Sequence, residues 1–176
     1  LSWATHKLPL ATGIARALTY MHSLSPPIVH RDLKPDNVLV DAAYCAKLAD
    51  FGTSREVDIN ATMETAGTPL FSAPELLRKE RYDEKVDVWG FACVLECMWT
   101  HEMVYADVGE SEGVGAAELL ERVENDQLRP STRDGFLSLL VQRCADLDPE
   151  KRPAFVRATG RSGASQVRIV DELTSS

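Results

Sequence analysis

The chain has 176 residues, of which 44% are hydrophobic and 26% are charged. This length fits one globular domain, and the hydrophobic fraction suffices for a packed core, so a wholly disordered or fibrous chain is excluded. Because 27 acidic residues outnumber 19 lysines and arginines, the net charge of −8 disfavours nucleic acid and anionic membrane surfaces as partners.

The first half of the chain predicts one helix followed by short strands. Leu10, Ile14 and Leu18 recur at helical spacing, which predicts a helix over residues 8–22 that the following prolines end. Short apolar pieces separated by polar turns then predict small hairpins, at residues 28–29, 38–40 and 46–48. Residues 52–68 are polar and without periodicity, which predicts a long functional loop.

The second half predicts a buried helix and two amphipathic ones. The helix within residues 83–99 is apolar nearly all round and is expected to cross the core. An acidic, glycine-rich loop is predicted at residues 109–115, and amphipathic helices near residues 116–124 and 135–144. Residues 160–176 turn to serine and glycine, so we expect a loose tail. The fold class is therefore mainly α with small β-hairpins.

Cysteine usage and targeting signals indicate the compartment. The four cysteines lie within apolar patterns without Cys-x-x-Cys pairs, as buried reduced thiols do: Cys45, Cys93, Cys97 and Cys144. No segment approaches the ~20 consecutive apolar residues of a membrane span, and we expect no signal peptide. We expect an intracellular, cytoplasmic protein without a membrane segment in this chain.

Three motifs follow one another in an informative order. Residues 30–37 read His-Arg-Asp-Leu-Lys-Pro-Asp-Asn, residues 50–52 read Asp-Phe-Gly, and residues 73–75 read Ala-Pro-Glu. Together they resemble the catalytic loop, the metal-binding triplet and the end of the activation loop of eukaryotic protein kinases. The resemblance implies a kinase C-terminal lobe over residues 1–159.

Further segments refine this resemblance. Lys34-Pro35-Asp36 is similar to serine/threonine rather than tyrosine kinases. The run from Asp87 to Glu96 resembles the core helix of the tyrosine-kinase-like (Raf-like) serine/threonine group. Residues 128–130 and 148–153 are similar to later segments of that group. The implied activity is transfer of the γ-phosphate of ATP to a serine or threonine hydroxyl of a protein substrate.

Phosphoryl transfer explains why such residues are needed. Its transition state is loose, so catalysis consists mainly of positioning and charge stabilisation. The resemblance implies that Asp32 orients the substrate hydroxyl and accepts its proton, while Lys34 contacts the transferring phosphate. Asn37 and Asp50 would supply oxygen ligands to Mg²⁺ beside the ATP phosphates.

The resemblance also implies regulatory and substrate-binding residues. Arg31 would pair with a phosphate on the loop before Ser72, with Thr62 and Thr65 as the predicted phosphorylation sites. Solvated loop threonines without such a role are the alternative. Thr68 is expected to contact Asp32 and Lys34 as part of the platform for the protein substrate.

Four further residues are expected to be structural. His30 would lie beneath the catalytic loop, and Asp87 would hold the backbone of that loop from the core helix. Glu75 and Arg152 resemble the buried ion pair of the family. Loss of one partner would leave a buried charge without compensation.

Parts of the kinase pattern are missing. Only 29 residues precede His30, and nothing among them resembles the glycine-rich loop or the Val-Ala-Ile-Lys strand of the N-terminal lobe. Because the chain starts at Leu1 rather than Met, we expect a piece of an active kinase that would be inactive by itself. A non-catalytic, kinase-like binding or regulatory module is the alternative.

Overall fold

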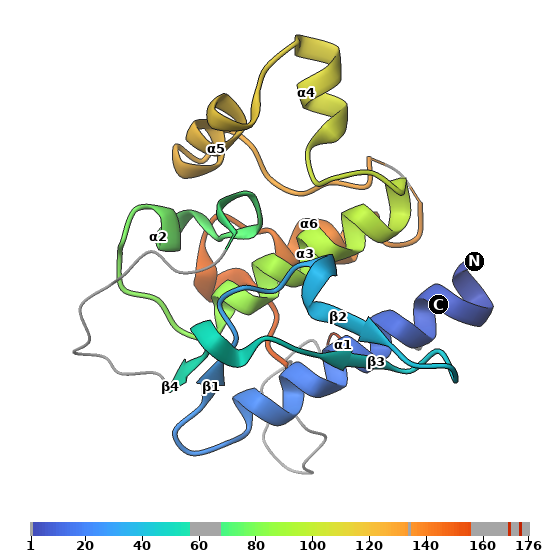
Figure 1. Ribbon diagram of the computed structural model, residues 1–176. Coiled ribbons are helices and arrows are strands. Elements are labelled where there is room, and N and C mark those ends of the chain that lie inside the picture. Colours follow the sequence, from blue (N-terminus) through green and yellow to red (C-terminus); the bar gives the residue numbers. More distant parts are fainter. Residues whose placement is uncertain (1, 57–67, 134, 156–168, 170–172, 174–176) are drawn as a thin grey trace.

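The computed structural model describes residues 2–56, 68–133, 135–155, 169 and 173, and in this part of the chain helices dominate over strands (Figure 1). The α-helices are α1 (Leu8–His22), α2 (Pro74–Leu77), α3 (Lys85–Thr100), α4 (Ala106–Glu112), α5 (Ala116–Glu124) and α6 (Ser138–Cys144). Shorter helical segments are η1 (Trp3–Lys7), η2 (Pro35–Asn37), η3 (Phe51–Thr53), η4 (Pro69–Phe71) and η5 (Pro149–Lys151). The prediction of a mostly helical fold with few strands is confirmed.

The strands form two separate antiparallel pairs. Strands β2 (Val38–Val40) and β3 (Ala46–Leu48) make the predicted hairpin, with Val38 opposite Leu48. Strand β1 (Ile28–Val29) pairs instead with β4 (Arg55–Glu56), which comes from the segment predicted as a loop. In the chain, the motif at residues 30–37 thus lies between β1 of one pair and β2 of the other.

Helix α3 forms the centre of the molecule, as its composition predicts. Every residue from Val86 to Glu96 is buried. Helix α1 and the β2–β3 hairpin lie on one side of α3, whereas α4 and α5 lie on the opposite side (Figure 1). Helix α6 packs directly against α3. The core helix therefore contacts both halves of the chain.

Two helix predictions differ from the structure. Residues 109–112 of the predicted acidic loop form the last part of α4 (Ala106–Glu112), which ends where Gly113 adopts a φ of 69°. This helix buries none of its residues, so it carries no apolar periodicity that could reveal it. Helix α6 begins at Ser138 rather than at Gly135, because Gly135 has a φ of 93°, which is not a helical conformation.

Two smaller expectations are also wrong at particular residues. Cys45 is exposed in the β2–β3 turn, although Cys93 and Cys144 are buried as predicted. Within the predicted loose tail, Ile169 and Leu173 are described, and both are buried in the core. Apolar side chains of the tail are thus recruited by the core at these two positions.

No helix in the described part of the chain combines the length and the apolar character that a bilayer span requires.

The β2–β3 hairpin presents apolar side chains to solvent. Leu39 is 57% exposed and Val40 is 49% exposed. Side chains of this kind normally lie against another part of a protein.

Candidate active site

The loop at residues 30–37 is held from below by Asp87 of α3. Its Oδ2 atom accepts a hydrogen bond from the backbone N–H of His30 at 2.8 Å, and its Oδ1 atom accepts one from Arg31 at 2.9 Å. Arg31 has a φ of 66°, a left-handed conformation that costs a non-glycine residue about 1–3 kcal/mol. The buried carboxylate therefore stabilises a backbone turn that the sequence alone disfavours.

A second residue, His22, supports Asp87 and was not predicted. Its Nε2 atom donates to Asp87 Oδ2 at 2.8 Å, and both side chains are buried. The sequence pattern identified His22 only as the last residue of a helix, and nothing in helical spacing links it to a carboxylate 65 positions later. The loop is thus fixed by contacts between three separate segments.

Asp32, Lys34, Asn37 and Thr68 form one hydrogen-bonded cluster at the surface of this loop. The Nζ atom of Lys34 lies 3.0 Å from Asp32 Oδ2 and donates to Thr68 Oγ1 at 2.6 Å. Asn37 Nδ2 donates to Asp32 Oδ2 at 3.0 Å, and the backbone N–H of Thr68 donates to Asp32 Oδ1 at 2.7 Å. The contacts predicted for Thr68 with Asp32 and Lys34 are therefore present.

This cluster lowers the pKa of the Asp32 carboxyl. Burial by itself raises the pKa of Asp32, but the hydrogen bonds from Lys34, from the Thr68 backbone and from Asn37 outweigh it, so the net pKa lies below its ordinary value. An ionised carboxylate with fixed neighbours is suited to accept a hydrogen bond from a hydroxyl group and to orient it.

Asp50 lies beside the cluster through the backbone rather than through its side chain. The N–H of Ala49 donates to the carbonyl of Asn37 at 2.9 Å, and His30 Nε2 donates to the carbonyl of Ala49 at 3.1 Å. The side chain of Asp50 is exposed, and its Oδ1 atom accepts the N–H of Gly52 at 3.3 Å. The structure thus joins Asp32, Lys34 and Asn37 directly, while Asp50 follows Ala49, whose backbone contacts Asn37 and His30.

Asn37 and Asp50 have the donor chemistry that Mg²⁺ prefers. The Nδ2 group of Asn37 donates its hydrogen bonds to Asp32, so the side-chain oxygen of Asn37 can act as an acceptor or a metal ligand. The exposed carboxylate of Asp50 offers a second oxygen donor. Two protein oxygens suffice for a Mg²⁺ ion whose other ligands are phosphate oxygens and water. The residues present fit a magnesium–nucleotide complex.

Arg31 is buried, and its guanidinium is directed toward another unpredicted residue. Nη1 of Arg31 donates to the hydroxyl of Tyr82 at 3.0 Å. Tyr82 lies in the segment between α2 and α3. This contact therefore connects the loop at residues 30–37 to that segment. The predicted phosphorylation sites Thr62 and Thr65 lie outside the described residues.

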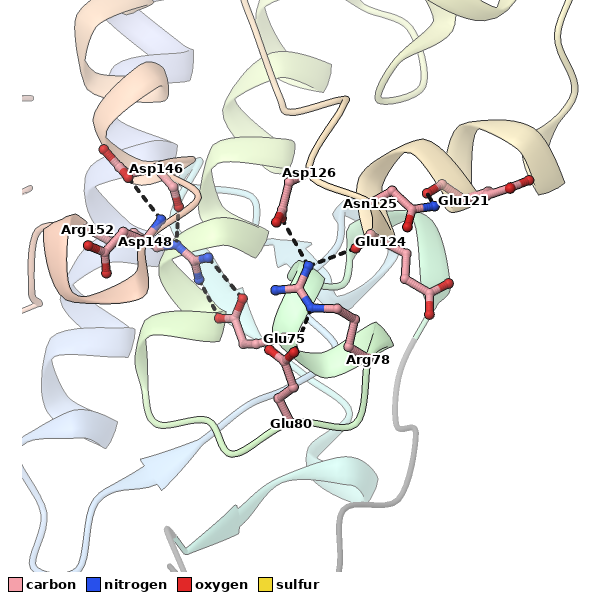
Figure 2. A network of polar contacts seen from close by, with 10 residues as sticks. All are labelled: Glu75, Arg78, Glu80, Glu121, Glu124, Asn125, Asp126, Asp146, Asp148 and Arg152. Carbon is pink, nitrogen blue, oxygen red and sulfur yellow. Dashed lines mark hydrogen bonds and ion pairs between the residues drawn. The ribbon is translucent and has the colours of Figure 1, made fainter.

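Glu75 and Arg152 form a buried, two-pronged ion pair (Figure 2). Nη1 and Nη2 of Arg152 donate to the two carboxylate oxygens of Glu75 at 2.6 and 3.0 Å. Arg152 also donates to the carbonyl of Asp146 at 2.7 Å and lies over the Trp89 ring. This geometry satisfies both charges inside the protein. The predicted pair therefore anchors α2 to the segment around η5.

Comparisons with known proteins agree with this arrangement. A family model described as the protein kinase domain matches residues 6–162. A "Probable serine/threonine-protein kinase" of Dictyostelium discoideum is 41% identical over 148 residues, which cover 83% of this chain and 16% of the relative. Mitogen-activated protein kinase kinase kinase 13 of Homo sapiens is 42% identical over 150 residues, which cover 82% of this chain and 15% of the relative.

A second Dictyostelium discoideum protein, "Probable serine/threonine-protein kinase drkC", is 36% identical over 162 residues, 88% of this chain and 21% of the relative. The chain thus spans about a fifth or less of the length of these curated relatives. Their names agree with the serine/threonine resemblance of residues 34–36. This chain belongs to the protein kinase domain family.

Proposed function

We propose that the protein transfers the γ-phosphate of ATP to a serine or threonine hydroxyl of a protein substrate. The observation that carries this proposal is the carboxylate of Asp32, which lies between the ammonium of Lys34 and the backbone N–H of Thr68. A substrate hydroxyl would donate to Asp32, which orients its oxygen toward the phosphorus and takes up its proton. The ammonium of Lys34 would offset negative charge on the phosphoryl oxygens.

ATP and Mg²⁺ are the proposed cofactors. Bound Mg²⁺ supplies charge neutralisation to the nucleotide phosphates, and Asn37 and Asp50 would be its protein ligands. Thr68 would belong to the platform for the substrate, since its backbone and hydroxyl already contact Asp32 and Lys34. His30, Asp87, Glu75 and Arg152 would act structurally, through the contacts described above.

The residues 1–159 are proposed to be the C-terminal lobe of the kinase, with an N-terminal lobe as its partner. Support comes from the β2–β3 hairpin, where Leu39, Val40 and Tyr44 are exposed although they are large and apolar. A second lobe over this hairpin would cover them and close the nucleotide site, which excludes water from the reaction. We also propose an intracellular, cytoplasmic location. Phosphorylation of Thr62 or Thr65 would regulate the protein, because Arg31 would form an ion pair with the phosphate.

The experiment uses the protein encoded by the longest reading frame that contains these residues. It measures the transfer of radiolabelled phosphate from ATP to a general protein substrate. Asp32→Asn should lower the rate at least ~100-fold, a typical loss for a group that handles the reacting proton. Asp36→Asn is the matched control, because Asp36 lies in the same loop but is exposed and outside the cluster. The 176-residue chain alone should transfer no detectable phosphate.

Two outcomes would contradict the proposal. One is a folded protein that transfers no phosphate when it is incubated with ATP. This result would favour the alternative of a non-catalytic binding or regulatory module. The other is transfer that survives Asp32→Asn at the level of the Asp36→Asn control. Phosphoamino-acid analysis of the product separates serine and threonine from tyrosine as acceptors.

A further inference from the structure

Helix α5 lies next to the segment that carries Thr68. It packs against η4, which begins directly after Thr68, and against α2. The side of α5 that faces the protein buries Leu119 and Val123. Apolar contacts of this kind hold a helix near its neighbours.

Arg78 fixes the C-terminal end of α5. It follows α2 directly, and its Nη1 atom donates to the carbonyl of Glu124 at 2.7 Å and to Asp126 Oδ1 at 3.0 Å (Figure 2). Its Nε atom donates to Glu80 at 2.9 Å. The last carbonyls of a helix lack partners within the helix and carry partial negative charge, so a cation is favoured there. One side chain thus binds α5 to the end of α2.

The same short segment is fixed at two other points. Glu75, one helical turn before Arg78, is held by Arg152 at 2.6 Å, on the opposite side of α2 in Figure 2. Thr68 at its beginning is held by the carboxylate of Asp32. Residues 68–78 therefore connect the candidate catalytic carboxylate, the core and α5, with Arg78 as the link to α5.

We propose that Arg78 is a positioning residue for the protein substrate, because it sets where α5 stands relative to Thr68. This inference rests on the proposed kinase function. A protein substrate must place its hydroxyl on Asp32 while the rest of its surface meets the adjoining elements. Arg78 contacts neither the nucleotide ligands Asn37 and Asp50 nor Asp32, so ATP use is unaffected by its removal.

The test compares Arg78→Ala with Arg122→Ala in the product of the longest reading frame that encodes these residues. Arg122 is a matched control, because its side chain is 26% exposed against 28% for Arg78 and also binds two carboxylates. Those carboxylates, Glu112 and Glu118, lie on α4 and α5 only. Arg122 therefore makes no link to residues 68–78 through these pairs.

Arg78→Ala should raise the KM for an intact protein substrate roughly fivefold or more, while kcat and the KM for ATP change less than about twofold. This pattern is expected because the variant weakens binding of the protein substrate and leaves the chemical step unchanged. Arg122→Ala should leave all three constants unchanged. Arg78→Lys keeps the charge but not the planar fork, so it should restore part of the effect. Arg78→Met, which keeps the aliphatic stem, replaces the alanine variant if that variant does not fold.

Hydrogen exchange of the 176-residue chain gives a readout that does not need catalysis. Arg78→Ala, but not Arg122→Ala, should speed exchange at the end of α5, where the N–H of Asn125 donates to Glu121. Unchanged exchange there, or an unchanged KM in an active enzyme, would overturn the inference. Absence of phosphate transfer in the unsubstituted protein would instead contradict the proposed function, and the exchange result would still test the link made by Arg78.

Discussion

Helix α3 holds loops at both of its ends through one buried carboxylate each, and the two ends differ. Near the beginning, Asp87 accepts the backbone N–H groups of His30 and Arg31 at 2.8 and 2.9 Å. Near the end, Glu96 accepts those of Tyr105 and Ser131 at 2.6 and 2.7 Å. The same physical device therefore orders the candidate catalytic loop on one side of the molecule and the surroundings of α4 on the other.

The difference lies in the additional partner. Asp87 also binds the imidazole of His22 at 2.8 Å, whereas the hydrogen bonds given above for Glu96 come from backbone groups. Burial raises the pKa of Glu96 to about 7, against the lowering effect of its two backbone hydrogen bonds, and the nearby charge of Asp107 raises it further. The comparison teaches that the carboxylate beneath the loop bearing Asp32 has a side-chain partner, His22, in addition to the two backbone groups that it binds.

The largest effect is expected for Asp87→Ala. This change leaves two buried backbone N–H groups, of His30 and Arg31, without their acceptor. The free energy of unfolding should fall by about 3–5 kcal/mol, since each buried donor without a partner costs ~1–3 kcal/mol and the left-handed Arg31 loses its support. Urea denaturation of the 176-residue chain measures this fall. A loss below about 1 kcal/mol would mean that Asp87 does not hold the loop.

A smaller, pH-dependent effect is expected for Glu96→Gln. Because the folded-state pKa of Glu96 is raised to about 7, above the ordinary 4.5, the folded protein binds this proton more tightly than the unfolded chain does. The contribution of Glu96 to the free energy of unfolding therefore falls as pH rises from about 4.5 to 7. The difference between the unsubstituted chain and Glu96→Gln should shrink by roughly 1–3 kcal/mol over this window.

Asp41→Asn provides the control for this pH profile, because its shift has the opposite sign. Hydrogen bonding from the backbone of Cys45 lowers the pKa of Asp41. Its contribution to stability is present near neutral pH and is lost only as pH falls into the acid range. If the Glu96→Gln difference stays constant between pH 4.5 and 7, the account of the α4 end is wrong.

The smallest effect is expected at His22, which supports Asp87 with one hydrogen bond. His22→Leu should lower the free energy of unfolding by about 1 kcal/mol, the typical net contribution of one intramolecular hydrogen bond. His22→Gln retains a donor of similar reach and should restore most of this loss. Thermal unfolding of both variants measures the difference, and equal losses would show that packing rather than the hydrogen bond matters.

The sequence predicted what depends on local patterns. Helices α1 and α5 have the predicted bounds, because their apolar side chains recur at helical spacing and prolines follow α1. The candidate catalytic residues were predicted because their motifs are local runs of residues. Helix α4 was missed, since a helix that buries none of its residues leaves no apolar period.

Contacts between distant segments could not be predicted in this way. His22 with Asp87 and Arg78 with Glu124 join residues 65 and 46 positions apart, and a lone polar residue at a helix end carries no sign of its partner. The left-handed φ of Arg31 is equally hidden, because tertiary hydrogen bonds impose it on a residue with no local preference for it. Tertiary placement, not propensity, determines these parts of the site.

Residue-resolved hydrogen exchange of two variants tests the central claim most directly. The claim is that α3 orders the candidate catalytic loop from one end and the α4 region from the other. In Asp87→Asn, the amides of His30 and Arg31 should exchange at least about tenfold faster, while those of Tyr105 and Ser131 keep their rates. Glu96→Gln should show the reverse. If either substitution accelerates all four amides alike, or neither pair responds, the two ends of α3 do not act as separate anchors and the account fails.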